Sequence, residues 1–536
     1  MKKLTALIAC LMVLVPCLLV SGCSSSLPAS ANQSISYQLT QEPITLDPQI
    51  ASDSAAVVVV EALFEGLVRL DVDNNPYPGV AKSWTANADH TQFTFSLRED
   101  AVWSNGDPVT AHDFVYAFQR ALTPSTGSTT ASSMYCIKNA KQVHAGTLSP
   151  SELGVSALDS HTLVVNLEYS YEDFPSLTAT APFMPCNQSF FESTEGQYCL
   201  EAKFILGNGP FVMDNRYAWT HGESIKLSRS SSYVGDQPVY PSSLNFTIKS
   251  YELTEAFQLL MDGDTDAAPI ASSWLESAKQ AGCAITAFQD TTWGLCFNTS
   301  SELMKHTTIR KAFVQTLNRD ALLQHLPKNT EIANDIINPD TTFLGQSYRS
   351  QAGSDFYLKQ DDSSLQAAIA VLPSLNLKTM PSVTVLCPDT TEAKRMVNEM
   401  IATWNAKMGN YFNMEPLSED ALAKRVTNGN YDIVLYPIRT KGQEPSQLLS
   451  LFQSDSESNP AFLKDPAYDA LFASAESSKG TESLSHYVAA EKYLNDQCVF
   501  YPLYYESRYY AAAPGVSGVV FHPYDTGIDF IRAGKE

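Results

Sequence analysis

The residues that commonly carry out catalysis do not occur in this sequence at the spacings that catalysis requires. The chain contains no G-x-S-x-G, S-x-x-K, H-E-x-x-H or G-x-x-x-x-G-K-[ST] signature. Its 9 histidines are scattered, with no pair at metal-ligand spacing. The acidic turn 262–266 (D-G-D-T-D) has its glycine in second place and lacks the glutamate of an EF-hand, so it does not indicate calcium. We therefore predict that the protein is not an enzyme and that it uses no metal and no cofactor.

The first residues predict export and a lipid anchor. Lys2 and Lys3 precede an apolar run, and small residues stand directly before Cys23. This is the pattern of a lipoprotein signal peptide, residues 1–22, whose removal leaves an acylated Cys23. Residues 23–34 are small and polar and predict a flexible stalk. A simple signal peptide followed by an incidental cysteine is the alternative. No other stretch of about 18 apolar residues exists, so we expect the lipid alone to hold the protein at the membrane.

The cysteines beyond the signal peptide contain no C-x-x-C pair, so a zinc ribbon is not indicated. Cys186 and Cys199 are separated by a short loop, and the predicted export is to an oxidising compartment. We therefore predict a disulfide between them, which would stabilise the fold by about 3 kcal/mol on the loop-entropy argument. Buried free thiols are the alternative for this pair.

The length and charge limit the partners of this chain. A chain of 536 residues exceeds what one hydrophobic core supports, so more than one domain is expected. The formal net charge is −23, and lysine and arginine form no clusters. We therefore expect no binding to nucleic acid and no attachment to anionic lipid through basic residues.

Hydrophobic periodicity predicts a mixed chain of strands and helices. Apolar and polar residues alternate over 93–97, as in a strand with one buried face. A turn follows, and Thr110 with Asp113 can form the capping box of a helix. Later in the chain, Asp389 is predicted to cap a helix whose apolar residues recur at helical spacing over 393–408. We interpret that stripe as core.

The region around the first of these helices resembles a known family. Its motifs are P-G-V-A-K-S-W (78–84), F-x-L-R (95–98), V-W-S-N-G-D-P-V-T-A (102–111) and D-F-V-Y (113–116). Together they resemble the signature of the peptide/nickel family (family 5) of extracellular solute-binding proteins, which capture ligands for ABC importers. The segments that follow, 137–140 and 148–158, are most similar to oligopeptide-binding lipoproteins of that family.

The resemblance implies a two-lobed α/β fold, the type II periplasmic-binding-protein-like fold in its three-domain peptide-binding variant. Hinge closure around a ligand in the crevice between the lobes is the expected motion. The expected division is lobe I from 35–75, 207–289 and 496–536, an inserted domain from 76–206, and lobe II from 290–495.

The resemblance also implies a set of ligand-binding residues. Glu65, in the turn Phe-Glu-Gly-Leu, corresponds to a glutamate at the ligand cleft of peptide-binding relatives, although it can equally be an acidic residue at a helix end. Trp293, Cys296 and Asn298 lie on the strand that enters lobe II and are expected to line the other side of the cleft. Thr130 stands where relatives place a tyrosine.

One loop departs from the family pattern. In peptide-binding relatives, an aspartate four residues before the proline of a Glu/Asp-Pro pair binds the α-ammonium of the peptide. Here that position is Lys441, with Arg439 nearby, and Ile438 replaces the expected tryptophan. Because a cation repels an ammonium, we predict a ligand without a free α-ammonium: an N-blocked or cyclic peptide, or a ligand that presents a carboxylate or phosphate. A loop shifted by a few residues, with Lys441 in solvent, is the alternative.

The resemblance predicts an extracytoplasmic solute-binding lipoprotein that delivers a peptide or peptide-like ligand to ABC permease subunits with a cytoplasmic ATPase. We expect a monomer on the outer face of the cytoplasmic membrane, or in the periplasm if the host has an outer membrane. An oligosaccharide, a metal chelate or an anionic compound is the alternative ligand. A sensor or adhesin that reuses the fold is the alternative function.

Overall fold

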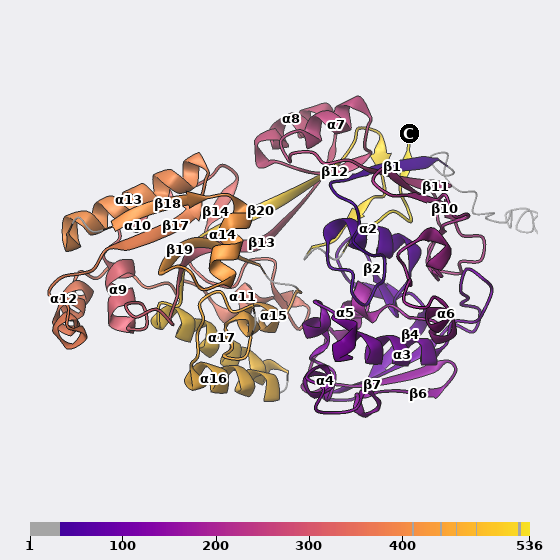
Figure 1. The fold of residues 1–536 in the computed structure, drawn as a ribbon, viewed down its shortest axis with the longest axis horizontal. Helices are drawn as coiled ribbons and strands as arrows, with labels where there is room; N and C mark the ends of the chain where they lie inside the picture. Colours follow the sequence, from indigo (N-terminus) through magenta and orange to yellow (C-terminus); the bar gives the residue numbers. More distant parts are fainter. Residues whose placement is uncertain (1–32, 410–411, 440–441, 457, 479, 524–526) are drawn as a thin grey trace, which may run out of the picture.

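The computed structural model describes residues 33–409, 412–439, 442–456, 458–478, 480–523 and 527–536. These residues form two lobes that are joined by long strands (Figure 1). Among them, no helix combines the length and the apolar character that crossing a membrane requires.

Lobe I combines the first strand, a middle segment and the C-terminal hairpins. Its sheet strands are β1 (Ser34–Leu39), β8 (Phe211–Val212), β9 (Trp219–Thr220), β10 (Ser224–Arg229), β11 (Ser243–Ile248) and β12 (Ala267–Ile270). Its helices are α2 (Ser54–Leu63), α7 (Ala256–Asp262) and α8 (Leu275–Ala281). Short hairpins complete it: β2 (Val68–Leu70) with β3 (Pro76–Pro78), β21 (Val516–Ser517) with β24 (Gly534–Lys535), and β22 (Val520–Phe521) with β23 (Ile528–Asp529).

The inserted domain is a four-stranded antiparallel sheet covered by short helices. Its strands are β4 (Ala81–Ala86), β5 (Gln92–Leu97), β6 (Val155–Asp159) and β7 (Thr162–Asn166), in the order β4-β5-β7-β6. Its helices are α3 (Ala111–Ala121), α4 (Ala140–His144), α5 (Phe174–Leu177) and α6 (Gln188–Ser193). The predicted capping box of Thr110 and Asp113 is present at the start of α3. One hydrophobic cluster contains the buried residues of this domain and of most of lobe I, so the two share a core.

Lobe II contains the second half of the large sheet, with helices on both faces. Its strands are β13 (Ala284–Phe297), β14 (Thr330–Ile332), β15 (Thr342–Phe343), β16 (Gln346–Ser347), β17 (Val383–Pro388), β18 (Phe412–Leu417), β19 (Ile433–Arg439) and β20 (Phe500–Ala512). Its helices are α9 (Thr307–Gln315), α10 (Arg319–Leu323), α11 (Tyr348–Ala352), α12 (Ser363–Val371), α13 (Thr391–Met408), α14 (Glu419–Thr427), α15 (Pro445–Leu449), α16 (Pro466–Ser477) and α17 (Thr481–Asp496). Separate hydrophobic clusters fill the two faces of its sheet.

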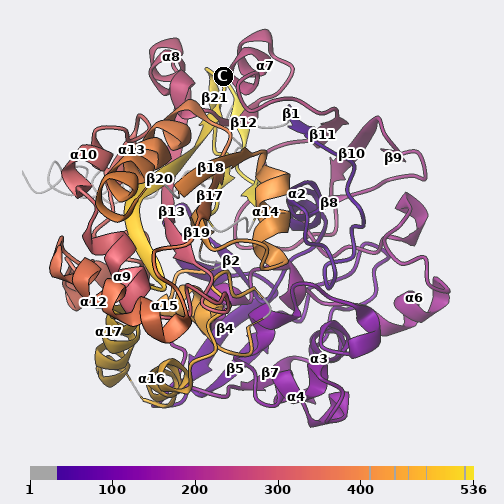
Figure 2. The same cartoon turned by 60° about the vertical axis from the view of Figure 1, so that its left-hand side comes forward.

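The long strands β13 and β20 carry the sheet from one lobe into the other (Figures 1 and 2). The main strand order is β18-β17-β19-β13-β20-β12-β1-β11-β10-β8, with β14 added at β20 and β9 at β10. β13 and β20 pair antiparallel from Ala284 opposite Ala512 to Cys296 opposite Phe500, with two irregularities in register. Bulges of this kind bend a strand pair and increase its twist, so this is the expected position of a hinge.

The cores and strands divide the chain differently from the sequence prediction at two boundaries. Residues 496–536 were assigned to lobe I, but Cys498, Tyr501 and Leu503 pack in a hydrophobic cluster of lobe II. The predicted boundary between 289 and 290 falls inside β13. Both differences have the same cause. The strands β13 and β20 run through both lobes, so neither strand belongs to one lobe alone.

Candidate functional site

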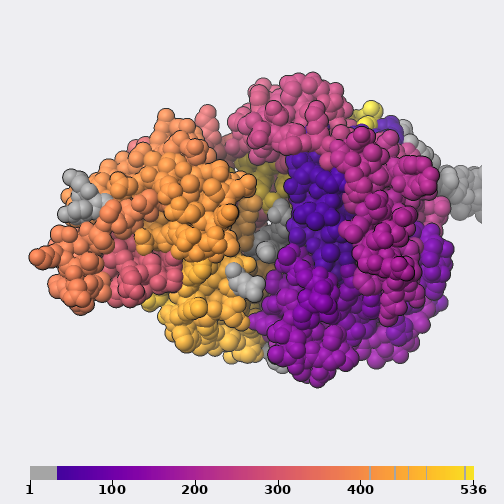
Figure 3. Space-filling model, in the orientation of Figure 1, coloured from indigo at the N-terminus to yellow at the C-terminus, as the bar shows by residue number. Residues whose placement is uncertain are grey.

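A hollow lies between the two lobes. Figure 3 shows it between the orange surface of lobe II and the indigo surface of lobe I. The indigo segment contains α2 and the residues that follow it, which line two pockets. His522 lines both pockets, so they are neighbours. These pockets are the candidate site on lobe I.

The turn after α2, which contains Glu65 of the first pocket, is in direct contact with the loop at 206–209. Asn208 accepts a hydrogen bond from the Glu65 backbone N–H at 3.0 Å and donates one to the Glu65 carbonyl at 2.9 Å. A Cβ at Gly207 would lie 2.2 Å from the Leu63 carbonyl oxygen, and one at Gly66 would lie 2.3 Å from that of Thr178. Neither glycine has a positive φ. They are therefore required for close backbone contact and not for a left-handed backbone conformation.

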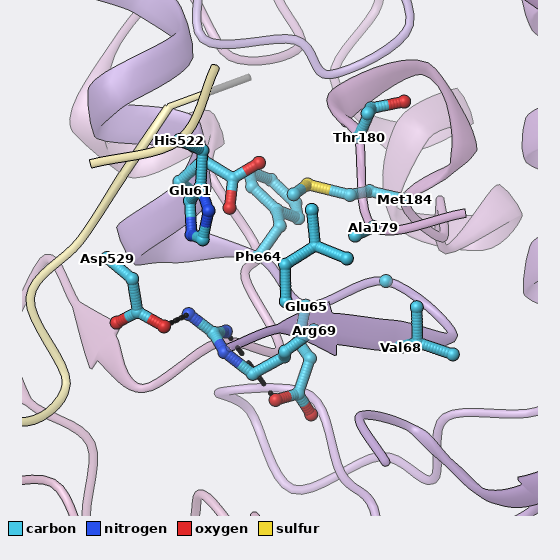
Figure 4. Close-up of a pocket in the computed structure, with 12 residues that line it drawn as sticks. Glu61, Phe64, Glu65, Val68, Arg69, Ala179, Thr180, Met184, His522 and Asp529 are labelled. Carbon is cyan, nitrogen blue, oxygen red and sulfur yellow. Dashed lines mark hydrogen bonds and ion pairs between the residues drawn. The ribbon is translucent and has the colours of Figure 1, made fainter. Parts of the chain in front are cut away.

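The Glu65 side chain belongs to a buried ionic cluster in this pocket (Figure 4). It accepts a hydrogen bond from the Tyr233 hydroxyl, and its Oε1 lies 3.6 Å from Nη1 of Arg69. On its other side, Arg69 donates from Nη2 to Oδ2 of Asp529 at 3.0 Å. Glu65 is only 3% exposed and Arg69 6%. The pocket thus brings one cation between two carboxyls, one of which comes from the far end of the chain.

The protonation of these carboxyls differs because their surroundings differ. Burial would raise the pKa of Asp529, but Arg69 outweighs this effect and holds that pKa below its usual value. Burial raises the pKa of Glu65 to about 7, although Arg69 and Tyr233 oppose the rise. Burial also raises the pKa of Glu61, in the same pocket, to about 8. Arg69 and Asp529 therefore remain ionised and paired near neutral pH, whereas the carboxyl groups of Glu65 and Glu61 gain or lose a proton in this range.

The second pocket is larger and is lined by aromatic side chains. Its volume is about 220 Å³, and Tyr37, Tyr251 and Tyr510 contribute to its walls. Tyr510 lies on β20 and comes from one of the strands that join the lobes. The two pockets together offer carboxyl groups and apolar rings side by side. Such a combination suits an organic ligand with both polar and apolar parts.

The residues predicted on lobe II do not meet at one place. Trp293 and Cys296 are three residues apart on a strand, so their side chains point to opposite faces of the sheet. Trp293 is half-buried, stacks on Tyr504 at a ring distance of 5.8 Å and donates to Glu506 at 2.6 Å. Cys296 is fully buried in the cluster on the other face, 3.6 Å from the Tyr431 hydroxyl. The expectation that both line the cleft is therefore wrong for Cys296 in this conformation.

Asn298 likewise has a structural role in place of the expected contact with ligand. It is 2% exposed, and its side-chain amide donates to the carbonyl oxygens of Gly429 and Tyr431 at 2.9 Å each. Its carboxamide oxygen accepts from Ser300. These hydrogen bonds connect the end of β13 to the loop before β19, and they occupy the polar atoms of the Asn298 side chain.

The other predicted residues have separate positions. Arg439 is exposed at the end of β19, where its Nε donates to Thr291 Oγ1 at 3.0 Å. Thr130 is half-buried in the inserted domain, beside Ser128 at 3.2 Å, and lines neither of the two pockets. Lys441 and Cys23 lie outside the described residues.

The predicted disulfide is not formed in the structure. Cys186 and Cys199 are both free and fully buried. Burial, followed by Asp47 and Cys186, raises the pKa of the Cys199 thiol, so the two cysteines occupy the same part of the core. Burial in an apolar core is the common environment of free cysteines, which was the alternative considered from the sequence.

Sequence reasoning missed most of the residues around Glu65. Arg69 and Asp529 are 460 positions apart, and nothing in either local sequence indicates that they pair. Tyr233 and His522 are also remote in sequence from α2. The one local signal was Arg69, which stands between apolar residues of a strand, because a buried arginine requires an acidic partner.

Comparison with known proteins identifies the family. Residues 75–460 match the family model described as bacterial extracellular solute-binding proteins, family 5 middle. This chain belongs to that family. The solute-binding protein is 25% identical over 487 residues to the dipeptide-binding protein DppE of Bacillus subtilis, with 90% of this chain and 88% of that one covered. It is 28% identical over 506 residues to the periplasmic murein peptide-binding protein MppA of Escherichia coli, with 91% and 92% covered.

A solved structure shares the fold of this solute-binding protein. The substrate-binding domain of an oligopeptide ABC transporter from Bacillus anthracis superposes with a TM-score of 0.74 at 26% identity, covering 95% of this chain and 99% of that one. The predicted two-lobed type II fold is thus confirmed. The relatives are binding proteins and not enzymes, which agrees with the absence of catalytic signatures from the sequence.

Proposed function

We propose that this solute-binding protein captures a peptide or peptide-like ligand in the hollow between its lobes and delivers it to an ABC importer. The observation that carries the proposal is the pocket of Glu65 and Arg69 beside an aromatic pocket, on the lobe surface that borders the hollow. Peptides carry hydrogen-bond donors, charges and apolar side chains, and these pockets offer partners for each. The names of DppE and MppA, as peptide binders, support the same ligand class.

Lobe closure would couple capture to delivery. Closing around a ligand removes water from the hollow, and permease subunits with their cytoplasmic ATPase would recognise the closed form. The protein would act as a monomer that presents one ligand at a time. Calorimetry with short peptides tests the ligand class, and an oligosaccharide, a metal chelate and a small anion are the comparison ligands. Binding of one of these in preference to every peptide would contradict the proposal.

The loop after β19 suggests which peptides are preferred. Arg439 is exposed there, and Lys441 replaces the aspartate of peptide-binding relatives. We infer that the ligand lacks a free α-ammonium and presents a neutral or anionic group to these cations. A peptide and its N-acetylated form should then differ in calorimetry, with the acetylated form bound more tightly. Micromolar binding of the free-amine peptide, unaffected by Lys441→Ala, would contradict this inference.

A lipid at Cys23 would keep the protein beside its permease. Tethering raises the effective concentration of the binding protein at the importer without any new contact. Cys23→Ala should release the protein from the membrane fraction or leave it unprocessed. The mature N-terminus of the unmodified protein should carry an acyl mass in mass spectrometry. An unacylated N-terminus, together with unchanged fractionation of the variant, would contradict the anchor.

A further inference from the structure

The lobes meet at a second place, away from the strands that join them. Figures 1 and 2 show α16 and α17 of lobe II beside the inserted domain. A small cavity of about 20 Å³ marks the contact. Residues 169–172 of the inserted domain line it on one side, and Glu444, Tyr487 and their neighbours in lobe II line it on the other. This contact, here called the inter-lobe contact, closes the hollow opposite the connecting strands.

The charged residues that line the cavity of the inter-lobe contact are carboxylates, Glu172 and Glu444. Glu444 is 6% exposed, and no ion pair to it exists among the described residues. Glu172 and Asp173 of the inserted domain act on it with like charge, and Tyr171 and Tyr487 also face it. Around Glu476, at the end of α16, the charged and titratable groups are Glu168, Asp455, Lys141, Tyr169, Tyr487 and Cys136.

Few cations offset these carboxyls in the described part of the chain. Lys141 reaches across to Asp455 at 4.0 Å, but both side chains are largely exposed. His90 lies 3.8 Å from Glu172 within the inserted domain. Exposed pairs of this kind contribute little, because water and salt screen them. When the lobes approach, the buried Glu444 is therefore brought beside carboxyls of like charge, and no buried cation compensates it among the described residues.

We propose that the inter-lobe contact is a proton-sensitive latch: the lobes close more readily when Glu444 and Glu476 are protonated and open when these carboxyls are ionised. The proposal rests on the proposed function, because it concerns the closure that retains the ligand. It assigns to this surface a regulatory role that is separate from the pockets around Glu65.

The direction of the pH effect follows from proton linkage. Burial and neighbouring acids raise the pKa of Glu476 to about 7 and that of Asp173 to about 6, and they also hold the pKa of Glu444 well above its usual value. An exposed carboxyl in separated lobes has a pKa of about 4. The closed form therefore binds more protons than the open form. Closure should become more favourable as pH falls through these raised values, by about tenfold per pH unit for each proton taken up.

Small-angle X-ray scattering of the full, ligand-free mature protein tests the latch. We expect the radius of gyration to decrease between pH 8 and about pH 5.5, as the closed fraction rises. The double variant E444Q/E476Q carries neutral side chains and should stay compact over the whole range. The matched control E302Q/E415Q removes the charges of an exposed and a half-buried carboxylate of lobe II, which pair with Lys305 and Arg425, and it should behave like the unmodified protein.

A further variant covers the case in which the double variant does not fold. E172Q changes only the inserted domain, and it should weaken the pH dependence by removing one like charge. A radius of gyration that does not change with pH would overturn the latch, as would identical pH dependence in E172Q and the unmodified protein. Because no ligand is present, these outcomes are independent of peptide binding. If the radius changes with pH but no peptide binds, the proposed function fails and the latch stands.

Discussion

Glu65 is a carboxyl that the fold holds out of water beside Arg69, and it should make stability depend on pH near neutrality. Its folded pKa of about 7 is above the value of about 4.3 in an unfolded chain. The contribution of Glu65 to the free energy of unfolding is therefore fully present at acidic pH, and it is lost as pH rises toward 7. The loss of unfolding free energy is on the order of 4 kcal/mol if the carboxyl must ionise in place.

Glu65→Gln should flatten this part of the stability profile, because glutamine keeps the hydrogen bond from Tyr233 without titrating. Urea unfolding at a series of pH values measures the effect. Glu276→Gln is the matched control, because its exposed carboxylate pairs with Lys279 on α8. Equal pH profiles for Glu65→Gln and the unmodified protein would show that Glu65 does not titrate in this range.

Trp293 should report on lobe movement, because it lies on a strand that serves both lobes. Its indole stacks on Tyr504 and donates to Glu506, both on β20. A change in the bend of these strands would alter the surroundings of the ring. We expect Trp293→Phe to remove much of the ligand-induced change in tryptophan fluorescence. Trp274 is 37% exposed on lobe I, and the variant Trp274→Phe should keep this fluorescence change. The opposite pattern would place the reporting tryptophan elsewhere.

At the scale of elements, the contact between the turn after α2 and the loop at 206–209 depends on missing side chains. Gly207→Ala would force a Cβ to within 2.2 Å of the Leu63 carbonyl oxygen. Because the new Cβ would meet a backbone carbonyl and not a flexible side chain, the clash can be relieved only by moving the main chain. We therefore expect a loss of more than about 3 kcal/mol of unfolding free energy. Gly106→Ala is the comparison, because it meets nothing within 4 Å and bears only the strain of its φ of +91°. The variant Gly106→Ala should lose about 1 kcal/mol of unfolding free energy. Similar losses in the two would contradict the steric explanation.

Elements defined by local sequence could be predicted, and contacts between distant residues could not. The strand at 93–97, the capping box at Thr110 and the helix that ends at Met408 all appear as the periodicity indicated. Even there, Thr390 and not Asp389 caps the helix, because neighbouring polar residues compete for the same position. For the site, the family motif singled out Glu65 as a candidate, whereas strand alternation places Trp293 and Cys296 in clusters on opposite faces of the sheet. Arg69 and Asp529 meet only through the fold.

At the scale of the whole molecule, one sheet gives both lobes a common frame while leaving a hollow between them. Lobe I and the inserted domain share a core and should move as a unit, so opening and closing would concentrate in β13 and β20. The proposed ligand site at Glu65 and the inter-lobe contact at Glu444 lie in different parts of this arrangement. Ligand and protons would thus favour the same closed form through separate contacts.

Mass spectrometry of the ligand released from protein purified from its native host tests the central claim most directly. The account predicts that the protein carries one bound molecule, that fragmentation of this molecule gives amino-acid residues, and that its N-terminus is blocked or absent. Glu65→Gln should alter the amount retained, while the Glu276→Gln control should not. Release of an oligosaccharide, a metal chelate or another compound without peptide bonds would contradict the account.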